Sequence, residues 1–542
     1  MGNTMQRLRL ALSISILCVP MAHAHGWFGE PDVSLSKLGT YSSGKFAEGA
    51  AEIVAYDHNT RRVFTVNASD VAVDVLDASN PRQLQKVGVI DASALGGSAN
   101  SVAVYNGLLA VAIEATDRQA NGVVAFYRTS DLSLINTVDV GALPDMVTFD
   151  STGRYAVVAN EGEPNDDYTI DPEGSVSVID IRRGARLATV RHATFTALNG
   201  QEAALRAQGV RIYGPNASAA QDFEPEYITT SGRQAYVTLQ ENNAIAVVDL
   251  PSATVTKILP LGYKDHSMPG NGLDPSDRDN AIAIGNWPVH GIYSPDAIDS
   301  YQYRGKTFLV TANEGDTRDY DGYSEEARVS SLALDPIAFP DAAALKANSA
   351  LGRLTVTKSL GDVDGDGDYD ALYVPGGRSF SIWSSDGEQV FDSGSDIESI
   401  TANLLPDNFN SNHDEQPSKD SRSDNKGPEP EGIAIGEYFG RTYAFVGLER
   451  MSGIMVYDIT NPQDVSFVEY VSNRNFDVPV CLTDASGDCV AANPEAGDLG
   501  PEGLNFVPWY RSPTYRPLLV VGNEVSGTTT VYQLNLKFDR RK

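Results

Sequence analysis

The chain has 542 residues, with 41 Lys and Arg against 72 Asp and Glu and a formal net charge of −31. This acidic excess argues against a nucleic-acid partner, because binding a phosphate backbone requires Lys and Arg. It favours a protein that meets cations or cationic surfaces, or one that is kept soluble by its charge. An apolar content of 42% excludes wholesale disorder. The length alone suggests three or four domains, but all-β rings often reach this size as one unit.

The first 24 residues have the pattern of a secretory signal peptide. Arg7 and Arg9 precede the short apolar run 10–19, and residues 22–24 (Ala-His-Ala) form a cleavage site. The run is too short to span a membrane, and no later stretch of 18 apolar residues follows. We therefore expect a secreted or periplasmic protein without an integral membrane segment, in which residues 25–542 form one domain.

Two cysteines lie beyond this segment, Cys481 and Cys489. In an oxidising compartment their spacing predicts a disulfide that pins a loop, and two free thiols are the alternative. The seven His are scattered and none forms an HExxH motif, so no zinc site is predicted.

Several segments of the chain repeat one pattern of strands. Each begins with an acidic or small residue, continues with two strands of which the second ends near Asn or Glu, and adds a third strand that ends near Asp. Most copies are followed by a fourth strand in which polar and apolar residues alternate. Clear copies begin at Ala51, Pro144, Pro225, Pro430 and Pro501, and weaker ones near Asn100 and at Pro295. Four short strands per repeated unit are typical of a β-propeller.

The last unit lacks a fourth strand, and residues 35–41 supply a matching one. We therefore predict an all-β fold, a β-propeller closed by the mature N-terminal strand, which leaves no long free sheet edge. Seven clear units and one aberrant unit around 361–396 predict seven or eight blades. Inserts are expected at 193–221, 262–285, 333–350 and 398–428, with surface loops in the second and fourth and short helices at 202–207 and 341–347.

The repeat places many carboxylates on one face of the ring. In an antiparallel blade the start of the first strand and the end of the second lie at the same end. The acidic residues at these positions are Glu52, Asp145, Glu226, Asp296, Glu431 and Glu502 at the starts, and Glu114, Glu161, Glu241, Glu314, Glu449 and Glu524 at the ends. Such oxygen ligands suit Ca²⁺ or Mg²⁺. The alternative is that each carboxylate caps a turn and satisfies backbone amides.

Two related clusters depart from the repeat, at 159–168 and at 312–320. The second contains Glu314, Asp316 and Arg318, and the fork of an arginine suits a phosphate or carboxylate held beside a metal. A third polar stretch, 410–426, is expected to fold over the same face. It contains His413, which is either a ligand or catalyst, or an ordinary surface residue.

The sharpest motif is an aspartate loop at residues 362–370. Its aspartates are Asp362, Asp364, Asp366, Asp368 and Asp370. The spacing matches the first half of an EF-hand loop, and Gly367 permits the tight turn, but Tyr373 stands where an EF-hand has a bidentate Glu. We expect a short Ca²⁺ loop in which the first, second, third and fifth aspartates are the main ligands. A solvated turn is the alternative.

Beyond these patterns, the chain resembles the choice-of-anchor I family. The stretches that carry the resemblance are 312–320, 362–373, 376–383, 390–394, 409–413 and 427–432. The resemblance extends over essentially the whole mature chain and implies a secreted or cell-surface propeller. Some bacterial members are labelled alkaline-phosphatase-like, but the family has no agreed catalytic residues to carry over.

Two functions follow from these observations. The first is a secreted Ca²⁺-binding propeller whose acidic face, with Glu161, Glu314 and Asp316 among its ligands, recognises an extracellular ligand or surface. The alternative is a Ca²⁺-dependent phosphoesterase acting on a phosphate-bearing small molecule. Its candidate residues are Glu161, Glu314, Asp316, His413 and Glu431, with Arg318, Arg378 and Arg450 to neutralise the phosphoryl group. A lactonase or a quinone- or haem-type propeller is a third class, and no Cys-x-x-Cys-His site for covalent haem is present.

Overall fold

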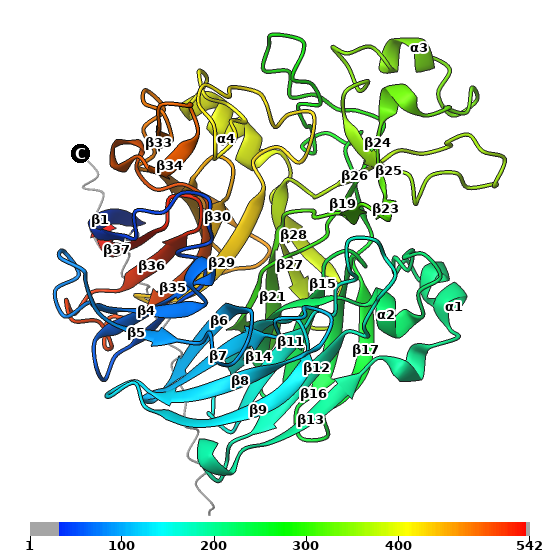
Figure 1. Ribbon diagram of the computed structural model, residues 1–542. Coiled ribbons are helices and arrows are strands. Elements are labelled where there is room, and N and C mark those ends of the chain that lie inside the picture. Colours follow the sequence, from blue (N-terminus) through cyan, green and yellow to red (C-terminus); the bar gives the residue numbers. More distant parts are fainter. Residues whose placement is uncertain (1–31, 538–542) are drawn as a thin grey trace, which may run out of the picture.

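The computed structural model describes residues 32–537, which form seven four-stranded antiparallel sheets (Figure 1). Five sheets use four consecutive strands: β2–β5 (Val54–Asp57, Arg62–Asn67, Ala72–Asp77, Gln85–Asp91), β6–β9 (Ser98–Tyr105, Leu108–Glu114, Asn121–Arg128, Leu134–Ala142), β10–β13 (Pro144–Phe149, Tyr155–Asn160, Ser175–Asp180, Thr189–Thr194), β14–β17 (Pro225–Ser231, Gln234–Leu239, Ala244–Asp249, Thr254–Pro260) and β29–β32 (Pro430–Tyr438, Arg441–Leu448, Gly453–Asp458, Ser466–Val471). The first strand of each sheet contacts the first strand of the next sheet along the chain. The expectation of an all-β, propeller-type fold is therefore confirmed.

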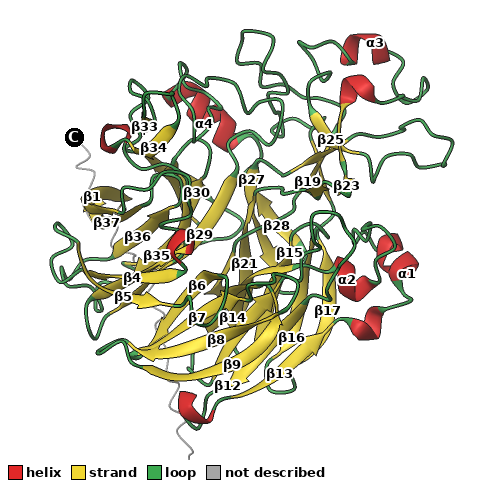
Figure 2. Cartoon of the chain, in the orientation of Figure 1, coloured by secondary structure: helices red, strands yellow, loops and turns green. Residues whose placement is uncertain are grey.

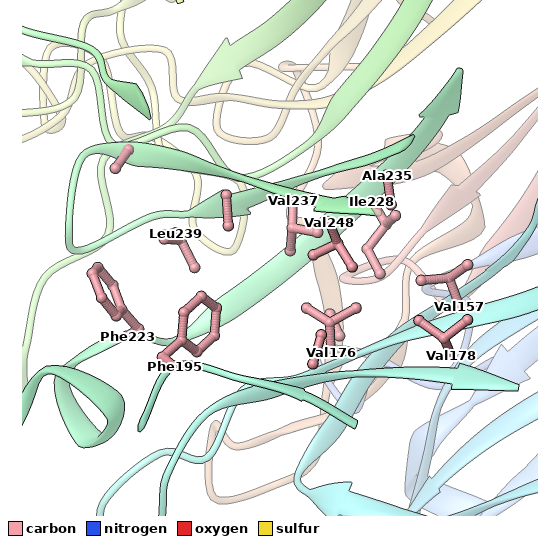
Figure 3. Close-up of a cluster of buried hydrophobic side chains, with 14 of the residues drawn as sticks. Val157, Val176, Val178, Phe195, Phe223, Ile228, Ala235, Val237, Leu239 and Val248 are labelled. Carbon is pink, nitrogen blue, oxygen red and sulfur yellow. The ribbon is translucent and has the colours of Figure 1, made fainter. Parts of the chain in front are cut away.

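The sheets pack face to face through their middle strands. Between the third and fourth sheets, Val157 and Val178 face Ile228, and Val237 lies beside Val248 (Figure 3). Because the middle strands are covered on both sides, they are almost continuously apolar. The fourth strands are mostly exposed or half-buried, as in β5 and β32. Figure 2 shows the strands in yellow and the loops that join them in green. This packing holds the first strands around a common centre.

The sheet at the centre of the chain is interrupted by a long insertion. Its strands are β20 (Ile298–Tyr303), β21 (Lys306–Asn313), β27 (Ser379–Ser384) and β28 (Gln389–Asp392). The aberrant unit expected around 361–396 is thus not a sheet of its own, because it supplies the outer half of this one. Gly315 adopts a φ of +100°, and a Cβ there would lie 2.1 Å from the backbone nitrogen of Gly376. The insertion therefore leaves and rejoins the sheet where two backbones pass in contact.

The insertion and residues 262–292 form a lobe with a hydrophobic core of its own, which includes Leu273, Phe339 and Leu372. The elements of this lobe are β18 (Tyr263–Asp265), β19 (His290–Ile292), β22 (Asp319–Tyr320), β23 (Tyr323–Ser324), β24 (Glu326–Arg328), α3 (Ala342–Leu345), β25 (Thr355–Thr357) and β26 (Tyr373–Pro375). It stands beside the sheets at the upper right of Figure 1. The expected helix at 341–347 is found here in a shorter form.

The first described strand joins the last sheet. β1 (Asp32–Ser42) pairs antiparallel with β37 (Thr528–Lys537), which continues into β36 (Leu518–Asn523) and β35 (Pro501–Val507). Leu35 lies opposite Leu534 in this pairing. The strand expected at 35–41 lies within β1, which is the outer strand of the last sheet.

The remaining elements are short. They are α1 (Glu202–Ala207), α2 (Ala219–Asp222), α4 (Asp396–Leu404) and the hairpin of β33 (Cys481–Thr483) with β34 (Cys489–Ala492). A disulfide joins Cys481 to Cys489, as the sequence predicts. None of the helices between residues 32 and 537 is long and apolar enough to cross a membrane. The expected signal peptide, residues 1–24, lies outside the described residues.

Candidate metal centre

A β-bulge at the start of the first strand turns an acidic residue away from the ladder in four of the sheets. In the third sheet, Pro144 pairs with Asn160 and Val147 with Val158, so that two residues, Asp145 and Met146, oppose one. The same shift frees Glu226, Glu431 and Glu502 in their sheets. A bulge re-aims side chains while the flanking register is kept. The repeated bulge thus delivers one carboxylate per sheet to a common place.

These carboxylates line a cavity of about 330 Å³ at one end of the first strands. Its acidic residues are Asp145, Glu161, Glu226, Glu241, Asp296, Glu314, Asp316, Glu431, Glu449, Glu502 and Glu524, and its two cationic residues are Lys426 and Arg450. Residues from the starts of first strands and the ends of second strands therefore do meet, as the sequence predicts. Glu161, Glu314, Asp316 and Glu431, which were expected to share a site, all lie in this lining.

One side of the cavity has carboxylates without cationic partners. Single oxygens of Asp145, Glu161 and Glu226 lie within 4.8 Å of one another. No ion pair or side-chain hydrogen bond joins any of the three to another residue in the part of the chain that the structure describes. Nearby Glu241 is only 5% exposed, and its Oε2 has no hydrogen-bond partner. Buried carboxylate oxygens without partners are costly unless a proton or a cation compensates them.

The electrostatics of this side favour protonation in the absence of a cation. Burial, reinforced by Glu163, raises the pKa of Asp145 to about 7. Burial and the neighbouring carboxylates hold the pKa values of Glu161 and Glu226 well above their ordinary range. Burial, followed by the charge of Glu524, raises the pKa of Glu52 to about 8. A divalent cation would relieve the same repulsion that these protons relieve.

Another side of the cavity brings cationic residues into contact with some of its carboxylates. The Lys426 ammonium lies 2.6 Å from Glu314 Oε1 and 3.3 Å from Glu429 Oε2. Arg450 Nε lies 3.0 Å from the same Glu429 carboxylate, which Arg422 also contacts. Burial opposes ionisation of Glu429, but these three cations outweigh it and hold its pKa below the ordinary range. This side is therefore an ion-pair network. On the side of Asp145, Glu161 and Glu226, the nearby cation Arg118 pairs with Glu163 and Glu114 instead, so the three converging carboxylates are the better metal site.

His413 belongs to this network. Its Nδ1 lies 3.1 Å from Glu449 Oε1, and the Arg450 guanidinium donates to its Nε2 at 2.5 Å. Burial and the charge of Arg450 lower its pKa to about 4. The neutral ring therefore donates from Nδ1 to Glu449 and accepts at Nε2, and both nitrogens are engaged. Residues 410–426 do fold over the acidic face, as expected.

Arg318 and Arg378 are held elsewhere by buried carboxylates. Arg318 is 1% exposed and lies 3.0 Å from both Asp222 and Glu224. Arg378 is 3% exposed, lies 2.7 Å from Glu398, and donates to backbone carbonyl groups of the 398–428 insert. The fourth insert is consequently not the surface loop expected from its composition, because its polar groups pack around buried charges.

The aspartate loop is exposed on the lobe, and four of its five carboxylates accept backbone N–H groups of the loop, Asp370 from Val363 at 2.8 Å. Asp362 accepts backbone N–H groups from Gly365 and Gly367, at 2.8 and 3.2 Å, and so holds the turn itself. Asp364 and Asp366 each accept from the backbone two residues further on. Oxygens of Asp368 and Asp370 converge within 4.8 Å with Asp335. The candidate ligand triad thus differs from the one that the spacing favours.

Sequence reasoning missed Asp335, Lys426 and Glu429. Asp335 reaches the loop because Leu334 bridges to Tyr369 in parallel and its own N–H donates to the Tyr369 carbonyl. A single Asp after an apolar residue gives no signal for that contact. Glu429 lies in the stretch 427–432, which carries part of the family resemblance. Its φ of +48° turns the chain just before the bulge.

Relatives of known sequence cover parts of the chain. Gigasin-3a from Magallana gigas is 32% identical over 192 residues, which are 34% of this chain and 66% of that protein. The mesenchyme-specific cell surface glycoprotein of Strongylocentrotus purpuratus is 30% identical over 282 residues, 45% of this chain and 36% of that protein. The matches therefore span less than two thirds of either relative.

Among solved structures, the β-propeller domain of Cps50 (Swd1) from Myceliophteria thermophila aligns with 93% of this chain and 99% of its own, at 8% identity and a TM-score of 0.41. The choice-of-anchor I domain matches residues 52–462, which contain the aspartate loop and most of the residues that line the acidic cavity. The chain belongs to the choice-of-anchor I domain family.

Proposed function

We propose that this protein is an extracellular Ca²⁺-binding β-propeller of seven blades, closed by β1, whose acidic cavity holds divalent cations. The seven four-stranded sheets, the pairing of β1 with β37 and the contact between β35 and β2 support the closed ring. The disulfide and the family support an extracellular setting.

The convergence of Asp145, Glu161 and Glu226 carries the proposal of cation binding. Three carboxylates within one coordination sphere, without a cationic partner among residues 32–537, form a hard oxygen site. Lys426 and Arg450 line the cavity elsewhere and Arg118 pairs with Glu163, so a bound cation would collect at the three unpaired carboxylates. Because the cavity opens at the end of the ring, a bound Ca²⁺ with free coordination positions would meet an anionic group of an extracellular ligand or surface.

The aspartate loop would be a second, smaller Ca²⁺ site through Asp335, Asp368 and Asp370. It lies in the lobe and not among the residues that line the cavity. We assign it a structural role, since the cation would fix the loop that joins Leu334 to Tyr369. The two sites can therefore be tested separately.

Calorimetric titration of Ca²⁺ into the chelator-treated full chain tests the proposal. The loop variant Asp368→Asn/Asp370→Asn isolates the cavity, and addition of Asp145→Asn and Glu226→Gln removes the cavity ligands. We expect the loop variant to keep Ca²⁺ uptake and the combined variant to lose it. Glu388→Gln, an exposed carboxylate on a turn at the opposite end of its sheet, is the matched control. A loop variant that takes up no Ca²⁺ would refute cation binding in the cavity.

A further inference from the structure

An aromatic cleft lies at the opposite end of the first strands from the acidic cavity. Tyr438 and Phe439 come from the turn between β29 and β30, and Trp509, Tyr515 and Arg516 come from the loop between β35 and β36. They enclose about 460 Å³. β29 begins at the acidic cavity beside Glu431 and ends at Tyr438, so that the two sites are separated by the length of a strand.

The rings of the cleft are exposed to an extent that the fold does not require. Phe439 is 67% exposed, Trp509 is 51% exposed and Tyr515 is 79% exposed, and neighbouring Tyr510 is also exposed. Contiguous exposed aromatic side chains mark interaction sites more often than isolated ones do. All of the apolar lining is aromatic, because no aliphatic side chain lines the cleft.

The backbone conformation of the turn at Phe439 does not favour an aromatic residue. Phe439 has a φ of +51° and is followed by Gly440 at +74°. Asn and Gly suit such positions, whereas a bulky side chain there is strained. The equivalent turn between β6 and β7 is formed by Asn106 and Gly107. The chain therefore carries an exposed ring where a smaller residue would make a better turn.

The charge of the cleft is opposite to that of the chain. Arg516, the charged residue in its lining, forms no ion pair with a carboxylate anywhere in the described range 32–537, although the whole chain carries a net charge of −31. Arg516 donates one N–H to Asn535 Oδ1 at 2.7 Å, which leaves its other N–H groups for a ligand. Neighbouring Arg511 lies 5.9 Å from the centroid of the Tyr510 ring and lines a separate cavity.

We propose that this cleft binds an acidic polysaccharide. The apolar face of a sugar ring stacks on Trp509 or Tyr515, while Arg516 pairs with its carboxylate or sulfate groups through fork-shaped hydrogen bonds. Flat rings that line a hollow suit a chain of sugar rings. A membrane surface would instead be met by a protruding set of mixed aliphatic and aromatic side chains. The proposal does not depend on cation binding in the acidic cavity.

Binding of oligosaccharides to the full chain tests the proposal. A polyuronate, a sulfated galactan and a neutral β-glucan oligosaccharide are titrated in the presence of a chelator, so that no Ca²⁺ bridges the acidic glycans to the carboxylates. We expect binding of at least one acidic glycan and much weaker binding of the neutral one. Phe439→Asn suits the turn and Trp509→Ala removes a ring, and each should weaken binding by about tenfold, the value of one stacked ring.

Two further variants complete the test. Arg516→Gln should weaken binding of the acidic glycan and leave binding of the neutral one unchanged. Ile337→Ala, at an exposed apolar position on the lobe, should bind as the unsubstituted protein does. The proposal is overturned if neither acidic glycan binds, or if Phe439→Asn and Trp509→Ala bind as tightly as the unsubstituted protein. Binding to anionic lipid vesicles but to no glycan would also overturn it, in favour of a membrane contact.

Discussion

Arg318 and Asp222 meet at 3.0 Å across 96 positions of sequence, and both side chains are 1% exposed. The contact joins the lobe to the insert after β13. The Arg318 guanidinium also lies over the ring of Tyr213 at 4.5 Å. The cluster 312–320 suggests phosphate binding, but its Arg318 forms a buried contact between two inserts instead.

Replacing this arginine should therefore destabilise the fold. Arg318→Met leaves the carboxylates of Asp222 and Glu224 buried without compensation, and we expect a loss of about 3–5 kcal/mol in the free energy of unfolding. Urea denaturation measures the loss. Arg233→Gln, which removes an exposed pair with Asp249, should change stability by less than about 1 kcal/mol. Equal midpoints for the two variants would contradict the structural role of Arg318.

The ligands of the aspartate loop can be distinguished by single substitutions. Asp335→Asn should weaken Ca²⁺ binding at the loop as much as Asp368→Asn does, because both remove one of three converging oxygens. Asp366→Asn should have a smaller effect, since Asp366 is not one of these three converging residues. Terbium luminescence at the loop, in the background Asp145→Asn/Glu226→Gln, reports the three affinities. A larger loss for Asp366→Asn would favour the ligand set suggested by the spacing.

His266 makes the fold sensitive to acid. It is 1% exposed, Nδ1 lies 2.6 Å from the carbonyl oxygen of Asn271, and Nε2 has no hydrogen-bond partner. Burial, followed by the charge of Lys264, lowers its pKa to about 3. As the pH falls, the His266 ring of the unfolded chain takes up a proton near pH 6.5, whereas the ring in the folded chain stays neutral until about pH 3. The stabilising contribution is therefore complete above pH 6.5 and is lost as the pH falls from 6.5 to 3.

The variant His266→Asn lacks the titrating ring but can still donate to Asn271. Between pH 7 and pH 5, we expect its free energy of unfolding to fall by about 2 kcal/mol less than that of the unsubstituted protein. Urea midpoints at the two pH values measure the difference. Parallel losses in the two proteins would show that His266 does not titrate in this way.

The disulfide should stabilise its hairpin locally. Cys481 and Cys489 are eight positions apart. Closing a loop of this size raises the free energy of the unfolded chain by about 2–3 kcal/mol, because it removes conformational entropy. The double variant Cys481→Ser/Cys489→Ser should therefore be cleaved faster by proteases near Leu482 and Val490, which are exposed. Mass spectrometry of the first fragments locates the cuts. Unchanged cleavage within 481–492 would show that β-pairing alone holds the hairpin.

The repeat was visible in the sequence because several first strands begin with the same short signal, a Pro followed by an acidic residue. Pro225-Glu226 and Pro501-Glu502 mark strand starts whose geometry then brings the carboxylates together. The bulges that aim them are not visible, since two opposed residues look like any others in an alternating strand. The aberrant unit was misleading because the insertion between Asn313 and Ser379 separates the halves of one sheet.

The details of the site depend on contacts between distant residues. Lys426 meets Glu314 across 112 positions, and no local pattern announces that pair. The polar composition of residues 398–428 predicts a solvated loop, yet Asn410 and Ser423 are buried around Arg378. Polar residues that satisfy a buried charge have the same composition as polar residues that face water.

The pairing of β1 with β37 has a consequence for the order of events in folding. Thr40 and Thr530 share a hydrogen bond at 2.8 Å across 490 positions. A ribosome makes β1 first and its partner last, so this sheet can be completed only when residues 528–537 have been synthesised. Contacts so distant in sequence form slowly. Until β37 has been made, β1 therefore has no partner strand, and its pairing with β37 is a late step in folding.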